Sequence, residues 1–304
     1  EEVERSQIMH NVLNRVFDGR LIFPPLTRPR RILDCGYGTA SWASEVAEQN
    51  ERCDSLIEFV RAWHDATEVI AGADGDIIPP GSKQSTRSTD SDLLFQVLGV
   101  DVYPYQPEEV PPNLYLQVDD LNRRFTFPAH NFDLVHSQLM TGGIHVNRWR
   151  EYVRDMFRVT RPGGWTQMVE LYLNVQSDNG SLSDDHALRQ WSTRYMESLE
   201  GLKDLRVPLR LPNMMRDAGF VDVEHRMIPL HTCAWSNDQR ENEIGAAFRE
   251  VVHRFLSSMA IYPFTERLGM TIQDVHLLVA QARLEADNPA FKVLYSKLIQ
   301  GCIG

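Results

Sequence analysis

Cysteine is scarce in this chain, and what there is forms no pattern. The sequence has four cysteines in 304 residues, and no two of them form a CxxC pair. Neither a zinc site nor a disulfide framework is expected from such usage. We therefore expect no metal and reduced thiols in an intracellular protein. Cys35, which stands in a glycine-rich stretch, is expected to fill space there rather than to react.

Basic residues and long apolar runs are also in short supply. The 42 carboxylates outnumber the 31 Lys and Arg residues, and the net charge is −11, which argues against binding of nucleic acid through a basic face. No run approaches 18 apolar residues, so no membrane span is expected. No signal-peptide pattern opens the chain, so we expect a cytoplasmic protein. The length suits one large α/β domain with insertions.

The stretch from 31 to 47, RILDCGYGTASWASEVA, organises the rest. A short apolar run reaches Asp34, and a turn with Gly36, Tyr37 and Gly38 leads into helix-compatible sequence. It lacks the Lys and Ser/Thr of a P-loop, and Ser41 stands where a dinucleotide fingerprint needs a third glycine. Asp-x-Gly-x-Gly after a strand is the form with which Rossmann-like methyltransferases hold S-adenosylmethionine. An ordinary strand-to-helix turn is the alternative.

A second strand is expected over 95–100, ending at Asp101 and Val102. In a doubly wound sheet, a carboxylate at the end of this strand accepts hydrogen bonds from the ribose hydroxyls. Such an acid usually follows the glycine turn by about 20 residues. We therefore interpret roughly 51–94, rich in Gly, Ser, Thr and Asp beyond residue 71, as an insertion with a loosely packed loop. A strand over 68–73 with Asp74 is the alternative.

Two further strands bring polar residues to the same edge of the sheet. A strand over 114–118 leads to Asp119, Asp120 and Leu121, where a carboxylate can accept from the adenine amino group. Either aspartate can instead cap a turn. A strand over 132–136 ends at His136, which we expect beside the transferred methyl group.

The other expected elements surround these strands. A helix over 2–18 forms a lid, in which Arg5 and His10 can reach the ligand, although a solvated face is the simpler interpretation for Arg5. The expected helices are 147–160, 184–203 (an insert), 212–218, 238–260 and 271–286, and the expected strands are 165–173 and 220–228. The first of these helices should stop at the Arg-Pro-Gly-Gly sequence over 161–164.

Five segments resemble a known family. LDCGYGTASWA at 33–43, VPPNLYLQVDDLNRRFTF at 110–127, FDLVHSQ at 132–138, MFRVTRPGGWTQMVE at 156–170 and RDAGFVDVEHR at 216–226 are similar to class I S-adenosylmethionine-dependent methyltransferases. They resemble in particular the LaeA-like (UMTA-type) proteins of filamentous fungi. The third glycine of the family's turn is Ala40 here, a change that we expect to be sterically mild.

The resemblance implies a Rossmann-like, doubly wound, mostly parallel seven-stranded sheet with a helical cap. The expected organisation is a lid helix over 1–30, a core over 31–230 and a C-terminal helical cap over 231–304. It also implies S-adenosyl-L-methionine as cofactor, with S-adenosyl-L-homocysteine as product. The family includes enzymes that methylate metabolites or peptides of secondary metabolism at O, N or S. It also includes regulators that act through protein partners in the nucleus, so both roles stay open, as does a homodimer.

Methyl transfer needs a base only when the acceptor carries a proton. The candidates are His136 and His145, followed by Glu170 and His231. Histidine suits the role because its unperturbed pKa is near neutrality. A structural role is the alternative for each of them.

Overall fold

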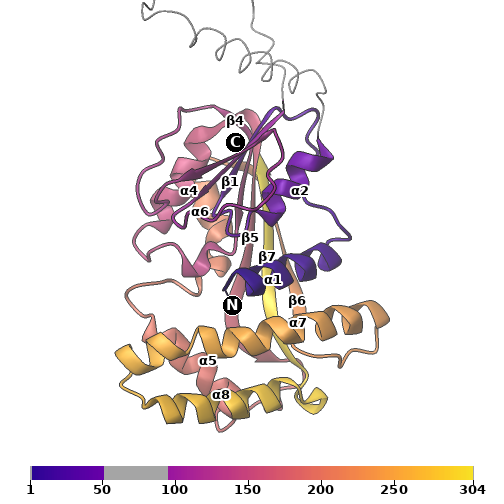
Figure 1. The fold of residues 1–304 in the computed structure, drawn as a ribbon, viewed down its shortest axis with the longest axis vertical. Helices are drawn as coiled ribbons and strands as arrows, with labels where there is room; N and C mark the ends of the chain where they lie inside the picture. Colours follow the sequence, from indigo (N-terminus) through magenta and orange to yellow (C-terminus); the bar gives the residue numbers. More distant parts are fainter. Residues whose placement is uncertain (1, 51–94, 304) are drawn as a thin grey trace, which may run out of the picture.

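The computed structural model describes residues 2–50 and 95–303, which form a sheet between helical layers (Figure 1). The strands are β1 (Arg31–Cys35), β2 (Gln96–Asp101), β3 (Leu114–Val118), β4 (Phe132–Gln138), β5 (Thr160–Ser177), β6 (Val221–His231) and β7 (Val293–Ile303). They lie in the order β3-β2-β1-β4-β5-β7-β6. The first five strands are parallel, and β7 runs antiparallel to both β5 and β6. The predicted seven-stranded, mostly parallel Rossmann-like sheet is confirmed.

Helices pack on both faces of the sheet and around the extension of its longer strands. They are α1 (Glu2–Val16), α2 (Ser41–Gln49), α4 (Trp149–Val159), α5 (Ala187–Ser198), α6 (Leu211–Ala218), α7 (Gln239–Ser258) and α8 (Ile272–Ala286). Figure 1 shows α2 on one face and α4 and α6 on the other, and α2 packs on β2 and β3 while α4 packs on β4 and β5. Helix α4 carries a row of fully buried apolar side chains, including Trp149, Val153 and Met156, because residues three and four apart share one helix face.

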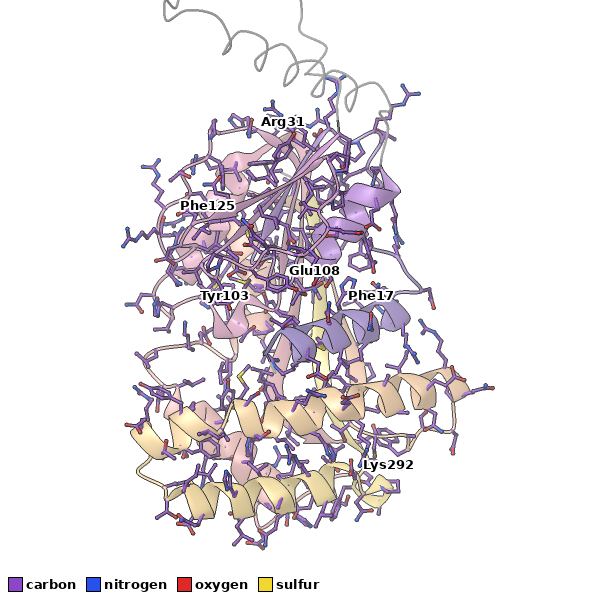
Figure 2. All side chains as sticks on the ribbon, in the orientation of Figure 1. Phe17, Arg31, Tyr103, Glu108, Phe125 and Lys292 are labelled. Carbon is purple, nitrogen blue, oxygen red and sulfur yellow. The ribbon has the colours of Figure 1, made fainter. Side chains whose placement is uncertain are left out.

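The carboxyl ends of the parallel strands face a second group of helices. In Figure 2, Arg31 at the start of β1 is labelled at the top, and Tyr103, just after β2, is labelled at mid-height. Below this level β5, β6 and β7 continue, and α1, α5, α7 and α8 pack around their extension (Figure 1). A separate hydrophobic core, which includes Trp191 and Phe248, joins these helices to the strands.

Two expectations about elements are wrong. The segment 231–304 is not helical to its end, because β7 closes the sheet between β5 and β6. Its first residues Val293, Leu294 and Tyr295 are all buried, so the start of the strand lacks the alternation of buried and exposed residues that marks a strand with one solvated face. The fifth strand begins at Thr160 rather than at Trp165, since Thr160 already pairs with Phe132.

Pro162 and Gly163 therefore lie inside the strand rather than ahead of it. Gly163 has a φ of +74°, and its left-handed conformation accompanies the register shift between the pairs at Phe132 and Leu134. The insertion expected over 51–94 and the alternative strand over 68–73 lie outside the described residues.

Candidate active site

The glycine turn joins β1 to α2 and is tied to the end of β2. The backbone N–H of Gly36 donates to the Val100 carbonyl at 2.7 Å, and that of Gly38 donates to Asp101 Oδ2 at 3.0 Å. Gly36 and Gly38 have φ angles of +83° and +55°. Glycine adopts such angles without steric cost, so the turn brings its backbone to the strand edge without side chains in the way.

Ala40, the last residue of the turn, also lies in the left-handed region, with a φ of +58°. For a residue with a Cβ this conformation costs about 1–2 kcal/mol. The alanine that replaces the family's third glycine is therefore strained rather than mild, and our expectation on this point is wrong.

Asp34 lies at the end of β1 beneath this turn and is 2% exposed. Burial raises the pKa of Asp34 to about 8, and the neighbouring Asp101 carboxylate contributes to the rise. No donor among the described residues makes a hydrogen bond to the Asp34 carboxylate. A cation placed beside it would restore the ionised form.

Asp101 presents a carboxylate to the same space. Its Oδ1 accepts from the Tyr103 N–H at 2.9 Å, and its Oδ2 accepts from Gly38. Each carboxylate oxygen has a second lone pair, so two further donors can still be accepted. Tyr37, another predicted site residue, is buried, and its hydroxyl donates to the Tyr103 and Tyr105 carbonyls at 3.2 and 3.1 Å. Tyr37 thus fixes the loop that carries Tyr103, whose N–H donates to Asp101.

A cavity of about 260 Å³ opens from the turn and runs to the helices below it. Its near end is formed by Asp34, the turn, Asp101 and the segment 138–142 that follows β4. Its far end is formed by α1, α7, Tyr195 and Tyr295. Most of the far walls are apolar, with Leu171 and Phe248 among them. One cavity therefore has a polar end at the sheet and continues between mostly apolar walls under the helices.

His136 lines this cavity but is held in a network of its own. Its ring is fully buried and stacks on Trp42, with 3.7 Å between ring centroids. The side-chain oxygen of Gln167 accepts from the Phe23 N–H at 2.8 Å, so the Gln167 NH₂ donates, both to the Leu21 carbonyl and to His136 Nδ1 at 3.1 Å.

This network determines the tautomer of His136. Because Nδ1 accepts from Gln167, a neutral ring carries its proton on Nε2. In that tautomer no lone pair is free to take a proton from a substrate. The arrangement favours a positioning role over that of a base.

Glu170, on β5, is another ionisable group of the cavity wall. It is fully buried, and burial raises its pKa to about 7 although three hydrogen bonds oppose the rise. Oε1 accepts from the Met140 N–H at 2.9 Å, and Oε2 accepts from the N–H and hydroxyl of Thr141 at 3.0 and 2.6 Å. Glu170 therefore holds the segment after β4 and titrates near neutral pH.

The other two candidate bases lie elsewhere. His145 is exposed, does not border the cavity, and pairs through its backbone with Lys203. His231 stacks on Trp235 at 3.8 Å and borders a separate cavity beside β6. The structure brings neither of them to the glycine turn.

Four further residues predicted to bind the cofactor, Val102, Asp119, Asp120 and Leu121, lie outside the cavity lining. Asp119 accepts from the Asp120 N–H and from the Thr126 hydroxyl at 2.8 and 3.2 Å. Asp120 accepts from the Asn122 N–H at 2.9 Å. Both carboxylates therefore accept hydrogen bonds within the local turn, which is the alternative to an adenine contact that the sequence left open. Leu121 is buried, and Val102 is 68% exposed at the surface.

Several lining residues escaped the sequence analysis. Met140 follows β4, and its sulfur would lie 2.2 Å from a Cβ on Gly36. Arg5, for which both a place near the ligand and a solvated face were open, borders the cavity. Tyr195 and Tyr295 come from the helix expected as an insert and from the unforeseen strand. Only the spacing of Arg5 and Met9 on one face of α1 could have signalled the lid residues.

The near end of the cavity fits a sulfonium nucleoside. A Cβ on Gly38 would meet no atom within 4 Å, so the turn leaves open space beside the Asp101 carboxylate. The buried Asp34 carboxylate offers a place for positive charge. Within residues 2–50 and 95–303 no cluster of His, Cys, Asp or Glu is arranged to hold a metal ion. No helix of the described chain is long and apolar enough to cross a membrane.

Comparison with known proteins bears on the same site. Residues 8–225 match the family described as "Methyltransferase domain". The chain is 25% identical over 290 residues to the secondary metabolism regulator laeA of Fusarium oxysporum f. sp. lycopersici, covering 94% of this chain and 79% of that protein. It is 27% identical over 293 residues to methyltransferase pytC of Aspergillus terreus, covering 94% and 75%.

A solved structure, phosphoethanolamine N-methyltransferase 2 of Haemonchus contortus, is similar with a TM-score of 0.47 and 16% identity. The similarity covers 98% of this chain, which spans about half of that one (52%). The family match, by contrast, extends from α1 into β6. The predicted LaeA-like resemblance and the prediction of an S-adenosylmethionine-dependent methyltransferase are therefore confirmed, and the chain belongs to the methyltransferase domain family.

Proposed function

We propose that this chain methylates a small molecule or peptide of fungal secondary metabolism, at oxygen, nitrogen or sulfur. The observation that carries the proposal is the single cavity that joins the glycine turn to an apolar space under the helices. An acceptor in that space would be shielded from water beside the cofactor site. The similarity to methyltransferase pytC, at 27% identity, supports the same conclusion.

The residues that would hold the cofactor come from the ends of β1 and β2. Asp101 would accept hydrogen bonds from the ribose hydroxyls, and the turn at Gly38, where a Cβ would meet no atom within 4 Å, leaves room for the sugar. Asp34 would balance the positive charge of the methionine part. Bound S-adenosylmethionine supplies an electrophilic methyl group on its sulfonium. The adenine contact predicted for Asp119 or Asp120 and the cofactor contacts predicted for Val102 and Leu121 stay predictions.

A proton-bearing acceptor would require a base, and Glu170 is the better placed candidate. It borders the cavity, and burial raises its pKa to about 7, which suits proton transfer near neutral pH. His136 would instead form part of the wall, with its ring fixed by Gln167 and Trp42. An amine or thiolate acceptor would need only correct approach.

Regulation is the second candidate function, because the laeA proteins to which the chain is similar are named secondary metabolism regulators. In that role the chain would act through a protein partner, in the nucleus. As an enzyme it would work in the cytoplasm, alone or as a homodimer. A regulator of this kind does not require an enclosed acceptor space, so the cavity favours the enzyme.

Transfer of labelled methyl groups distinguishes the two functions. The protein would be incubated with S-adenosylmethionine tritiated on its methyl group, together with either the small-molecule or the protein fraction of a fungal extract. We expect label in the small-molecule fraction, and none with Asp101→Asn, which loses one carboxylate oxygen at the ribose position. Label in the protein fraction alone, or in neither fraction, would contradict the proposal.

A further inference from the structure

Two tyrosines from distant parts of the chain meet at the far end of the cavity. Tyr195 lies on α5 and Tyr295 on β7, and both border the cavity. They are 3% and 1% exposed. Burial raises the pKa of Tyr195 to about 12 and raises that of Tyr295 further, and each lies near the same ring, Phe255. Both hydroxyls are therefore neutral donors at physiological pH.

Tyr295 lies well beyond the glycine turn. The strand β4 ends beside Val169 of β5, and the β7 residues on either side of Tyr295 pair with Tyr172 and Gln176. Each further strand residue adds about 3.3 Å. The distance from the strand edge leaves room for an acceptor molecule between the methyl-transfer end and this tyrosine.

The Tyr295 hydroxyl has no hydrogen-bond partner among the described residues. A buried hydroxyl without a partner costs about 1–3 kcal/mol, and phenylalanine would fill the same volume without that cost. Tyr295 is one of the residues that border the cavity, so we expect a bound molecule to provide the acceptor that its buried hydroxyl lacks. The position thus has the properties of a recognition group.

Positive charge lies at the same end. Arg5, on the lid helix α1, borders the cavity and is close enough to Tyr195 to lower the pKa of that hydroxyl. Between this end and the glycine turn the walls are apolar, with Leu171, Leu173 and Phe248 among them. An arginine with two tyrosine hydroxyls behind an apolar passage suits a ligand that is apolar along its length and anionic at its tip.

We propose that the far end of the cavity binds the carboxylate of an apolar acceptor substrate, with Tyr295 donating a hydrogen bond to it and Arg5 balancing its charge. This inference rests on the proposed function and names the substrate class of the same site. The methyl-accepting atom lies at the opposite end of the molecule, toward Glu170. Arg5, on the lid helix α1, thereby recognises the carboxylate, and an apolar molecule without a carboxylate binds weakly.

The test uses three probes with the same fused ring. These are 6-hydroxy-2-naphthoate, its methyl ester, and 2-naphthol, which lacks the carboxylate. Binding to the full chain saturated with S-adenosylhomocysteine is measured by calorimetry. We expect the naphthoate to bind at least about tenfold more tightly than 2-naphthol, as a charge-assisted hydrogen bond requires, with the ester between them.

The variants separate recognition from folding. Tyr295→Phe should lower the naphthoate affinity about tenfold, leave that of 2-naphthol unchanged and not lower the melting temperature, because the hydroxyl has no internal partner. The matched control is Tyr262→Phe, the same change at a side chain that is 71% exposed, and it should alter nothing. Arg5→Gln should also reduce the preference for the naphthoate. This variant provides the test of carboxylate recognition if Tyr295→Phe does not fold.

The outcomes distinguish this inference from the proposed function. If the wild type binds S-adenosylhomocysteine but does not prefer the naphthoate, the inference is overturned and the methyltransferase function stands. A loss of affinity for both probes in Tyr295→Phe would also overturn it, since a packing defect has that effect. If S-adenosylhomocysteine itself does not bind, the proposed function fails first.

Discussion

Replacing Asp34 by asparagine should make the stability of the protein less dependent on pH. The carboxyl is 2% exposed, and its pKa is about 8 in the fold against 3.8 for an ordinary aspartate. The difference is about four units at about 1.4 kcal/mol each, so ionised Asp34 destabilises the fold by about 6 kcal/mol above pH 8. Because the folded state binds this proton more tightly, the contribution is complete below pH 4 and is lost as the pH rises to about 8.

The amide of the Asp34→Asn variant does not titrate, so the difference between variant and wild type should grow by about 1.4 kcal/mol per pH unit between pH 5 and pH 8. A buried amide without partners costs about 1–3 kcal/mol at every pH, which shifts the curve but not its slope. Urea unfolding at four pH values measures the slope. The control is Asp217→Asn, which removes an exposed ion pair 3.6 Å from Arg150 and should change stability by less than about 1 kcal/mol throughout. Parallel curves for Asp34→Asn and wild type would refute the reasoning.

Two further changes test other parts of the site. Ala40→Gly relieves the left-handed conformation at a φ of +58° but gives the unfolded chain more freedom, so we expect unchanged stability or a gain of up to about 1 kcal/mol; a clear loss by thermal unfolding would contradict the strain. With a hydroxyl acceptor, kcat/KM should rise with pH through about 7, since Glu170 titrates there and a base must be ionised. Glu170→Gln should remove that rise and lower the rate by about 10²–10⁴, whereas an unaltered pH profile would exclude Glu170 as the base.

Local patterns predicted most of the fold, and the reasons are physical. The strands over 95–100, 114–118 and 132–136 were found within one or two residues of their ends because each is a short, mainly apolar run between turn residues. Helix α4 was found because its apolar side chains follow the helical period. β7 was not predicted because none of its pairing partners is adjacent to it in the sequence. It is held by β5 and β6, whose residues lie far away in the sequence.

The site divides in the same way. Asp34, Gly36, Gly38 and Asp101 were predicted because each follows directly from a strand and its turn. The far end of the cavity could not be predicted, because it is assembled from α1, α5, α7 and β7, and no sequence spacing connects Arg5 to Tyr295. The role of His136 was likewise hidden, since it depends on Gln167, which lies 31 residues away.

The most direct test of the cofactor site is a pair of glycine substitutions with the same backbone cost. Gly38 and Gly269 have φ angles of +55° and +66°, and a Cβ on either would meet no atom within 4 Å. Gly38→Ala and Gly269→Ala should therefore be destabilised alike. Only Gly38 borders the cavity.

The measurement is calorimetric titration of both variants and the wild type with S-adenosylhomocysteine. We expect Gly38→Ala to bind at least about tenfold more weakly, because its methyl group occupies the space beside Asp101, a loss of about 1.4 kcal/mol or more. Gly269→Ala should bind like the wild type. Equal affinities for Gly38→Ala and wild type would contradict the cofactor site at the ends of β1 and β2.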